Sequence, residues 1–178
     1  MDALEQVKYP IGRYEKPAGF NPELKKEWLG ILKALPSWMD ASIENLDEAQ
    51  LEVPYREGGW NIKQVVHHVA DSHLNAYVRL RLALTEDNPT VKPYDENAWA
   101  MLPDVNVVPV NVSVTMLHAM HRRLVALLEQ IPEADWQKTY YHPDHKRNFP
   151  VWEVVALYAW HSRHHTAHIQ ELRLRMGW

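Results

Sequence analysis

The stretch VWEVVALYAWHSRHHTAHIQELRLRM, residues Val151 to Met176, indicates both the fold and the chemistry of this chain. Its apolar residues recur at the 3.6-residue period of an α-helix, but histidines occupy several positions on the apolar face. When successive residues are placed about 100° apart around the helix axis, His161 and His165 lie within about 60° of Val154 and Leu172. One face of the predicted helix therefore carries both core residues and candidate metal ligands.

Two pairs of histidines on this helix have the four-residue spacing that lets two imidazoles bind one cation. His161 and His165 are centred on the apolar face, whereas His164 and His168 lie about 60° further round, toward its flank. A single histidine on an apolar face is usually a core residue with hydrogen-bonded ring nitrogens. Four within eight residues favour a metal site, because a shared cation satisfies two buried imidazoles at once. We rank His161 and His165 first.

Composition limits the classes of function. A chain of 178 residues that is 46% hydrophobic is long enough for one domain with a full core. The net charge of −4 and the predicted pI near 6.2 lack the basic surface of a nucleic-acid binder. The absence of cysteine excludes disulfides, thiolate ligands and a protein thiol nucleophile. Any thiol chemistry must therefore use a thiol from the substrate.

The N-terminal residues 1–20 carry interspersed prolines and glycines and predict an extended arm that packs on the rest of the domain. They contain no apolar run typical of a signal peptide. No segment of the chain reaches the roughly 18 apolar residues of a membrane span. We therefore expect a cytoplasmic protein without a membrane partner.

Three further helices are predicted from apolar residues at helical spacing, over residues 21–46, 60–84 and 113–131. Asn21 with Pro22, and Ser113, are expected to begin helices, and Pro36 is expected to kink or restart the first one. Residues 85–112 hold four prolines and no sustained period, which makes an unusually long connection. Such a crossover fits an all-α four-helix bundle whose middle helices run parallel, with residues 133–150 as a short hairpin or lid.

Histidines outside the last helix are candidates for the remaining ligand. The apolar stripe of the second predicted helix has His73 near its centre and His68 at its edge, so periodicity alone favours His73 as the better-buried residue. His121 is assigned to the outer side of the third helix. His142 and His145 lie in the predicted hairpin, where we expect them to be solvated.

The strings GGWNIKQVVHHVADSH, TEDNPTVKPYDENAW, YYHPDHK and WHSRHHTAHIQELRLRMGW, in this order, resemble the YfiT-like branch of the DinB/YfiT superfamily of metalloproteins. The resemblance covers nearly the whole chain, including YPIG near its start. It implies a single-domain four-helix bundle in up-down-down-up order, with a long crossover between helices 2 and 3. It also implies a divalent metal held by His68, which opens the HVADS string, and by His161 and His165.

The resemblance further implies activity and assembly. Members of this branch resemble metal-dependent hydrolases and bacillithiol-dependent S-transferases, and they are commonly dimeric, so a homodimer is expected. We follow the family motif in choosing His68 as the ligand from the second helix. His73, His164, Asp71 and Trp60 are then candidates to support the ligands from behind or to line the pocket.

Three neutral imidazoles leave a cation with its full charge and with open positions, which is the arrangement of a catalytic site. Zinc is the expected metal and nickel the second choice. Such a cation can activate water or a low-molecular-weight thiol against a small electrophilic substrate. In helix-borne metalloproteases a glutamate follows the first histidine and acts as the general base, but Ser162 occupies that position in this chain. The lack of this base favours thiol transfer, because a metal-bound thiolate needs less help from a base, and it leaves hydrolysis open.

Two other interpretations of the sequence keep the bundle and drop the catalysis. A non-catalytic metal-binding or metal-sensing protein would close the coordination shell with a fourth protein ligand, such as His73 or His164. A purely structural bundle would pair its histidines with polar groups instead.

Overall fold

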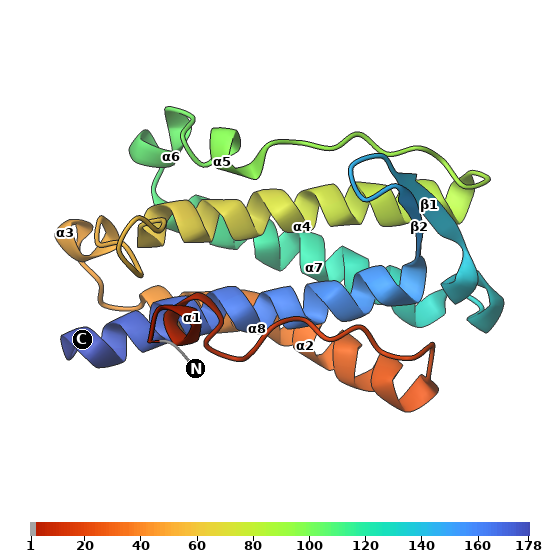
Figure 1. Ribbon diagram of the computed structural model, residues 1–178, viewed down its shortest axis with the longest axis horizontal. Helices are drawn as coiled ribbons and strands as arrows, with labels where there is room; N and C mark the ends of the chain where they lie inside the picture. Colours follow the sequence, from red (N-terminus) through yellow and green to blue (C-terminus); the bar gives the residue numbers. More distant parts are fainter. Residues whose placement is uncertain (1–2) are drawn as a thin grey trace.

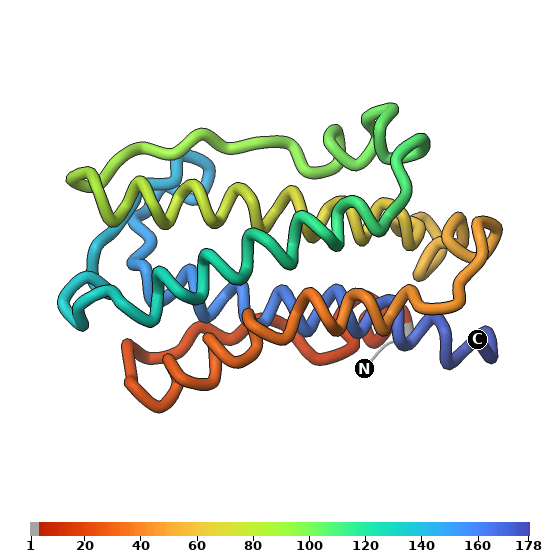
Figure 2. The backbone as a smooth tube through the Cα atoms, turned by 180° about the vertical axis from the view of Figure 1, so that it is seen from behind, coloured from red at the N-terminus to blue at the C-terminus, as the bar shows by residue number. Residues whose placement is uncertain are grey.

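The computed structural model describes residues 3–178 and is a four-helix bundle (Figure 1). Its long helices are α2 (Pro22–Ile43), α4 (Ile62–Thr85), α7 (Val110–Gln130) and α8 (Val151–Met176). Helices α2 and α8 run in one direction, and α4 and α7 run in the other (Figures 1 and 2). The predicted up-down-down-up order is confirmed.

Short elements decorate the connections. They are α1 (Ala3–Lys8), α3 (Glu48–Leu51), α5 (Glu96–Trp99), α6 (Asp104–Val107), the 3₁₀-helix η1 (Glu133–Gln137), and strands β1 (Thr139–His142) and β2 (Arg147–Pro150). The crossover that contains α5 and α6 lies along α4, at the top of Figure 1. The two strands form an antiparallel hairpin in which Thr139 is opposite Pro150 and His142 is opposite Arg147.

Local side-chain chemistry sets the ends of the long helices. The Asn21 side chain accepts a hydrogen bond of 2.7 Å from the backbone N–H of Glu23. Asn61 and Gln64 form a capping box at the start of α4, in which each side chain accepts from the other residue's backbone N–H. Gly177 ends α8 with a φ of 74°, a left-handed conformation that glycine adopts without steric cost.

Two predicted boundaries are wrong. Helix α7 begins at Val110 after Pro109, one turn before the expected Ser113, because the fixed φ of proline suits the residue preceding a helix. The Ser113 hydroxyl instead lies 2.7 Å from Nδ1 of His67. Helix α2 continues through Pro36 and ends at Ile43.

The N-terminal arm differs in part from the expected extended chain. Residues Ala3–Lys8 form α1, because ALEQVK consists of residues that tolerate a helix and the first proline comes only at Pro10. Met1 and Asp2 lie outside the described residues. The rest of the arm packs on α8, where Nε1 of Trp160 donates to the carbonyl of Gly12 at 3.3 Å.

The apolar core of the bundle forms two clusters. The cluster near the hairpin includes Leu32, Leu80, Leu124 and Val154, and the other includes Leu35, Val69, Leu117 and Ile169. Along the helices, the segments between these clusters contain His73, His121 and the histidines of α8. Within the described part of the chain, none of the helices combines the length and apolar character needed to cross a membrane.

Candidate metal centre

Three histidines from two facing helices converge on one point. His68 of α4 and His161 and His165 of α8 each offer a ring nitrogen, and these nitrogens lie within 4.8 Å of one another. The ring centroids of His161 and His165 are 4.4 Å apart, as expected for residues one helical turn apart. His68 lies 5.4 Å from His161 and 4.9 Å from His165 between ring centroids. We call His68, His161 and His165 the metal triad.

Burial keeps the metal triad neutral near pH 7. It lowers the pKa of His68 to about 4, and it lowers the pKa values of His161 and His165 well below 6.5, with a further contribution from neighbouring histidines. The ring of Trp60 covers His68, with 4.5 Å between ring centroids. Unprotonated imidazoles have the lone pair that a metal requires.

A cavity of about 340 Å³ opens at the metal triad. Besides the metal triad, it is lined by Tyr55, Arg56, Gly58, Gly59, Trp60, Glu96, Asn97, Trp160, His164 and His168. The walls therefore come from α8, from α5 in the crossover, and from the loop that precedes α4. Among the described residues that line the cavity, Glu96 is the sole carboxylate, and it is exposed.

His73 lies behind the metal triad and is completely buried. Its Nε2 is 3.2 Å from Nδ1 of His161, and its Nδ1 is 3.1 Å from Nε2 of His121. Both ring nitrogens are thus engaged in the core, so His73 is not available as a fourth metal ligand. Its contact with His161 places it in a supporting position.

His121 is buried, and its predicted outward orientation is wrong. Its Nδ1 donates to the backbone carbonyl of Leu32 at 2.6 Å, and its Nε2 faces His73. The spacing contained the signal, since His121 follows Leu117 by four residues and precedes Leu124 by three.

A second group of histidines shares one residue with the metal triad. His164, His165 and His168 also offer ring nitrogens within 4.8 Å of one another, and their Nδ1 atoms are buried without a hydrogen-bond partner. His168 stacks on Tyr55, with 4.1 Å between ring centroids. His165 is common to both groups. We prefer the metal triad because its ligands come from two helices.

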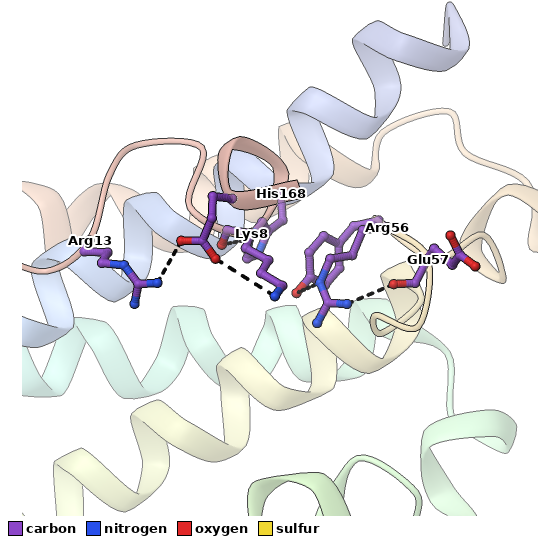
Figure 3. Close-up of polar contacts among 7 residues, drawn as sticks. Lys8, Arg13, Arg56, Glu57 and His168 are labelled. Atoms are coloured by element: carbon purple, nitrogen blue, oxygen red, sulfur yellow. Dashed lines mark hydrogen bonds and ion pairs between the residues drawn. The ribbon is translucent and has the colours of Figure 1, made fainter. Parts of the chain in front are cut away.

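Basic side chains lie where α1 approaches the loop before α4 (Figure 3), and one of them, Arg56, lines the cavity. Arg56 donates from Nη1 to the carbonyl of Glu57 at 2.9 Å and from Nε to the Tyr55 hydroxyl at 3.2 Å. Nε2 of His168 donates to the carbonyl of Lys8 at 3.0 Å. These bonds hold the guanidinium of Arg56 at the cavity wall and tie α1 to α8.

The carboxylates of Asp71 and Glu153 do not line the cavity at the metal triad. The side chain of Asp71 makes no hydrogen bond to a ring among the described residues, and burial, followed by the charge of Asp104, raises its pKa to about 6. Only 1% of the Glu153 side chain is exposed. It binds Arg147 and Lys16, partners in the hairpin and the arm that no local sequence pattern reveals.

Comparison with known proteins identifies the family of this chain. The sequence model of the DinB superfamily matches residues 31–169 of this chain. A protein of Bacillus mycoides (strain KBAB4), named as a putative metal-dependent hydrolase, is 46% identical over 98% of this chain and 100% of its own length. One of Bacillus licheniformis with the same description is 43% identical over 98% and 99%.

A solved structure has the same fold. YfiT from Bacillus subtilis, described as "a probable metal-dependent hydrolase with an unusual four-helix bundle topology", superposes with a TM-score of 0.94 at 42% identity, over 97% of this chain and 99% of YfiT. The extent of these matches, over a bundle that brings histidines of two helices together, shows that the chain belongs to the DinB superfamily.

Proposed function

We propose that the metal triad binds one divalent cation, zinc or nickel, and that the protein is a metal-dependent enzyme acting on a small electrophilic substrate. The observation that carries this proposal is the convergence of three unprotonated imidazoles on a cavity. The relatives named as metal-dependent hydrolases support it.

The donor set fits a catalytic cation. Imidazole suits zinc and nickel, and three protein ligands leave positions open on either metal. When bound, such a cation acts as a Lewis acid and lowers the pKa of a water or thiol that it holds. A closed sensing site is less well supported, because both ring nitrogens of His73 are already used in the core. His164, the other candidate for a fourth ligand, groups with His165 and His168 and not with the complete metal triad.

The residues of this chain supply the remaining parts of the proposed site. His73 supports His161 from behind, and Trp60 packs against the ring of His68. The guanidinium of Arg56 places positive charge at the cavity wall, which favours a substrate or co-substrate with an anionic group. The volume of about 340 Å³ suits a small molecule.

Between water and a thiol as the nucleophile, we propose a low-molecular-weight thiol. A thiol needs less help from a general base because it is more acidic than water. The exposed Glu96 is the sole carboxylate among the described residues of the cavity wall, and Glu153 is committed to ion pairs elsewhere. Hydrolysis is the second candidate, and the names of the relatives favour it.

The first test is the metal content of the purified, tag-free protein and of three variants. We expect about one zinc or nickel per chain in the native protein, and its loss in His161→Ala and His68→Ala. The matched control is His67→Ala, because His67 adjoins His68 on α4 and its Nδ1 contacts Ser113 instead of the metal triad. Full occupancy in His161→Ala would contradict the ligand assignment.

The second test separates the two reactions. The zinc-loaded protein is incubated with an electrophilic substrate, once with and once without a small thiol, and the products are identified by mass spectrometry. A thioether that forms faster with the native protein than with His161→Ala supports thiol transfer. A hydrolysed product formed without thiol supports hydrolysis instead.

A further inference from the structure

A continuous line of hydrogen bonds crosses the core from α2 to the metal triad. It begins at the carbonyl of Leu32 in α2 and passes through His121 of α7 and His73 of α4 to His161 of α8. The successive distances are 2.6, 3.1 and 3.2 Å. We call these three histidines the histidine chain. It joins all four long helices of the bundle.

The carbonyl of Leu32 gives the histidine chain a direction. A carbonyl oxygen only accepts, so Nδ1 of His121 carries the proton. A neutral imidazole has one N–H, so Nε2 of His121 is an acceptor and Nδ1 of His73 is the donor to it. Because His73 carries its proton on Nδ1, its Nε2 is the acceptor, and Nδ1 of His161 is the donor to it. The unprotonated nitrogen of His161 is therefore Nε2.

Pro36 explains why the carbonyl of Leu32 is available. In an α-helix this carbonyl would accept from the backbone N–H of the residue four positions later, which is residue 36. Proline has no N–H, so Pro36 leaves the carbonyl without its helical donor while α2 continues past it. His121 takes the vacant position at 2.6 Å. The proline inside α2 thus provides a fixed acceptor at the far end of the histidine chain.

We propose that His73 and His121 are positioning residues, which hold His161 as the Nδ1–H tautomer so that its Nε2 lone pair is presented to the cation. This inference rests on the proposed function of His161 as a metal ligand. A histidine ligand commonly donates its other ring N–H to a carbonyl or carboxylate, which fixes its ring and tautomer. Here two further histidines carry that role across the core to the carbonyl of Leu32.

The test measures zinc affinity by competition with a chromophoric chelator in two variants at one position. His73→Phe keeps the ring and removes both hydrogen bonds, and we expect it to weaken zinc binding by about 10- to 100-fold. His73→Gln has an amide that can accept from His161 and donate to His121, so we expect it to stay closer to the native affinity than His73→Phe. His142→Phe is the matched control. His142 lies in the hairpin and does not line the cavity, and it is buried, contrary to the prediction that it is solvated.

A second readout does not depend on any variant folding. In the metal-free native protein labelled with ¹⁵N at histidine, we expect His161 to show a protonated Nδ1 and an unprotonated Nε2. A protonated Nε2 at His161, or native zinc affinity in a folded His73→Phe protein, would overturn the inference. If the native protein bound no zinc, the proposed function would fail, while the ¹⁵N spectrum would still decide the tautomer.

Discussion

Lys16 of the N-terminal arm and Glu153 in the first turn of α8 form an ion pair of 2.8 Å in which only 1% of the Glu153 side chain is exposed. Arg147 of the hairpin binds the same carboxylate at 2.6 Å. Burial alone would raise the pKa of Glu153, but its bonds to Arg147 and Lys16 outweigh burial and lower it. One carboxylate therefore fastens the arm and the hairpin to the start of α8.

Replacing Glu153 should destabilise the fold. We expect Glu153→Gln to lower the free energy of unfolding by about 1–3 kcal/mol, because it weakens buried charge-assisted bonds. Lys16→Met should cost less, about 0–1 kcal/mol, since half of the Lys16 side chain is exposed and Arg147 remains in place. Urea unfolding of both variants at pH 7 checks this order. Equal stability of Glu153→Gln and the native protein would contradict it.

The metal-free protein should lose stability as the pH falls from about 6.5 toward 4. Burial lowers the pKa of His121 to about 4, against 6.5 for an ordinary histidine. Between these values the unfolded chain binds more protons than the folded one, so unfolding becomes easier as the pH falls. Such a group contributes up to about 1.4 kcal/mol per pH unit. Urea titrations across this range should show a shallower slope for His121→Gln, and an unchanged slope would count against a neutral buried His121.

Asp71→Asn should stabilise the protein at pH 7. Burial, followed by the charge of Asp104, raises the folded-state pKa of Asp71 to about 6 from 3.8. A carboxyl group whose pKa is raised in the folded state contributes less to the stability of the fold as the pH rises through that pKa. At neutral pH the ionised Asp71 therefore destabilises the folded protein. We expect the midpoint of thermal unfolding to rise by a few degrees, at about 2–4 °C per kcal/mol. An unchanged midpoint would contradict the prediction, and loss of zinc from the variant would indicate a role for Asp71 in the site.

Pro36→Ala should change stability and zinc binding in opposite directions. Proline inside a helix costs about 3 kcal/mol relative to alanine, so the variant should unfold at a higher urea concentration. Its new N–H would compete with His121 for the carbonyl of Leu32, so zinc binding should weaken. Chelator competition and urea unfolding on the same sample decide the matter. A variant that was more stable and bound zinc as tightly as the native protein would show that the carbonyl serves both donors equally well.

The sequence predicts the long helices well because their signals are local. Apolar spacing and the caps at Asn21 and Asn61 depend on residues within a turn or two of each other. The signal for His161 and His165 is also local, because two residues four positions apart on one helix lie on the same face. Periodicity favoured His73, which is indeed the more deeply buried of the two, but burial does not identify a ligand, and of His68 and His73 only His68 lines the cavity. The choice of His68 came from the family motif.

The parts that sequence reasoning missed depend on contacts between distant segments. His121 meets His73 and Leu32 only after α7, α4 and α2 have packed, and the role of Pro36 becomes visible only with that contact. Glu153 likewise finds Lys16 across more than a hundred residues of chain. In each case the individual residue looks ordinary, and its partner is set by the tertiary arrangement.

The histidine chain also bears on how the bundle is aligned. Apolar stripes pack almost equally well when one helix slides along another by a turn of about 5.4 Å. A buried hydrogen-bond donor and its acceptor allow no such freedom, because a slip of one helix would leave both groups buried without a hydrogen-bond partner or water. Because one residue of each long helix takes part, the line from Leu32 to His161 sets the register of the whole bundle. The lengthwise match between α4 and α8 at the metal triad is then in place before any cation arrives.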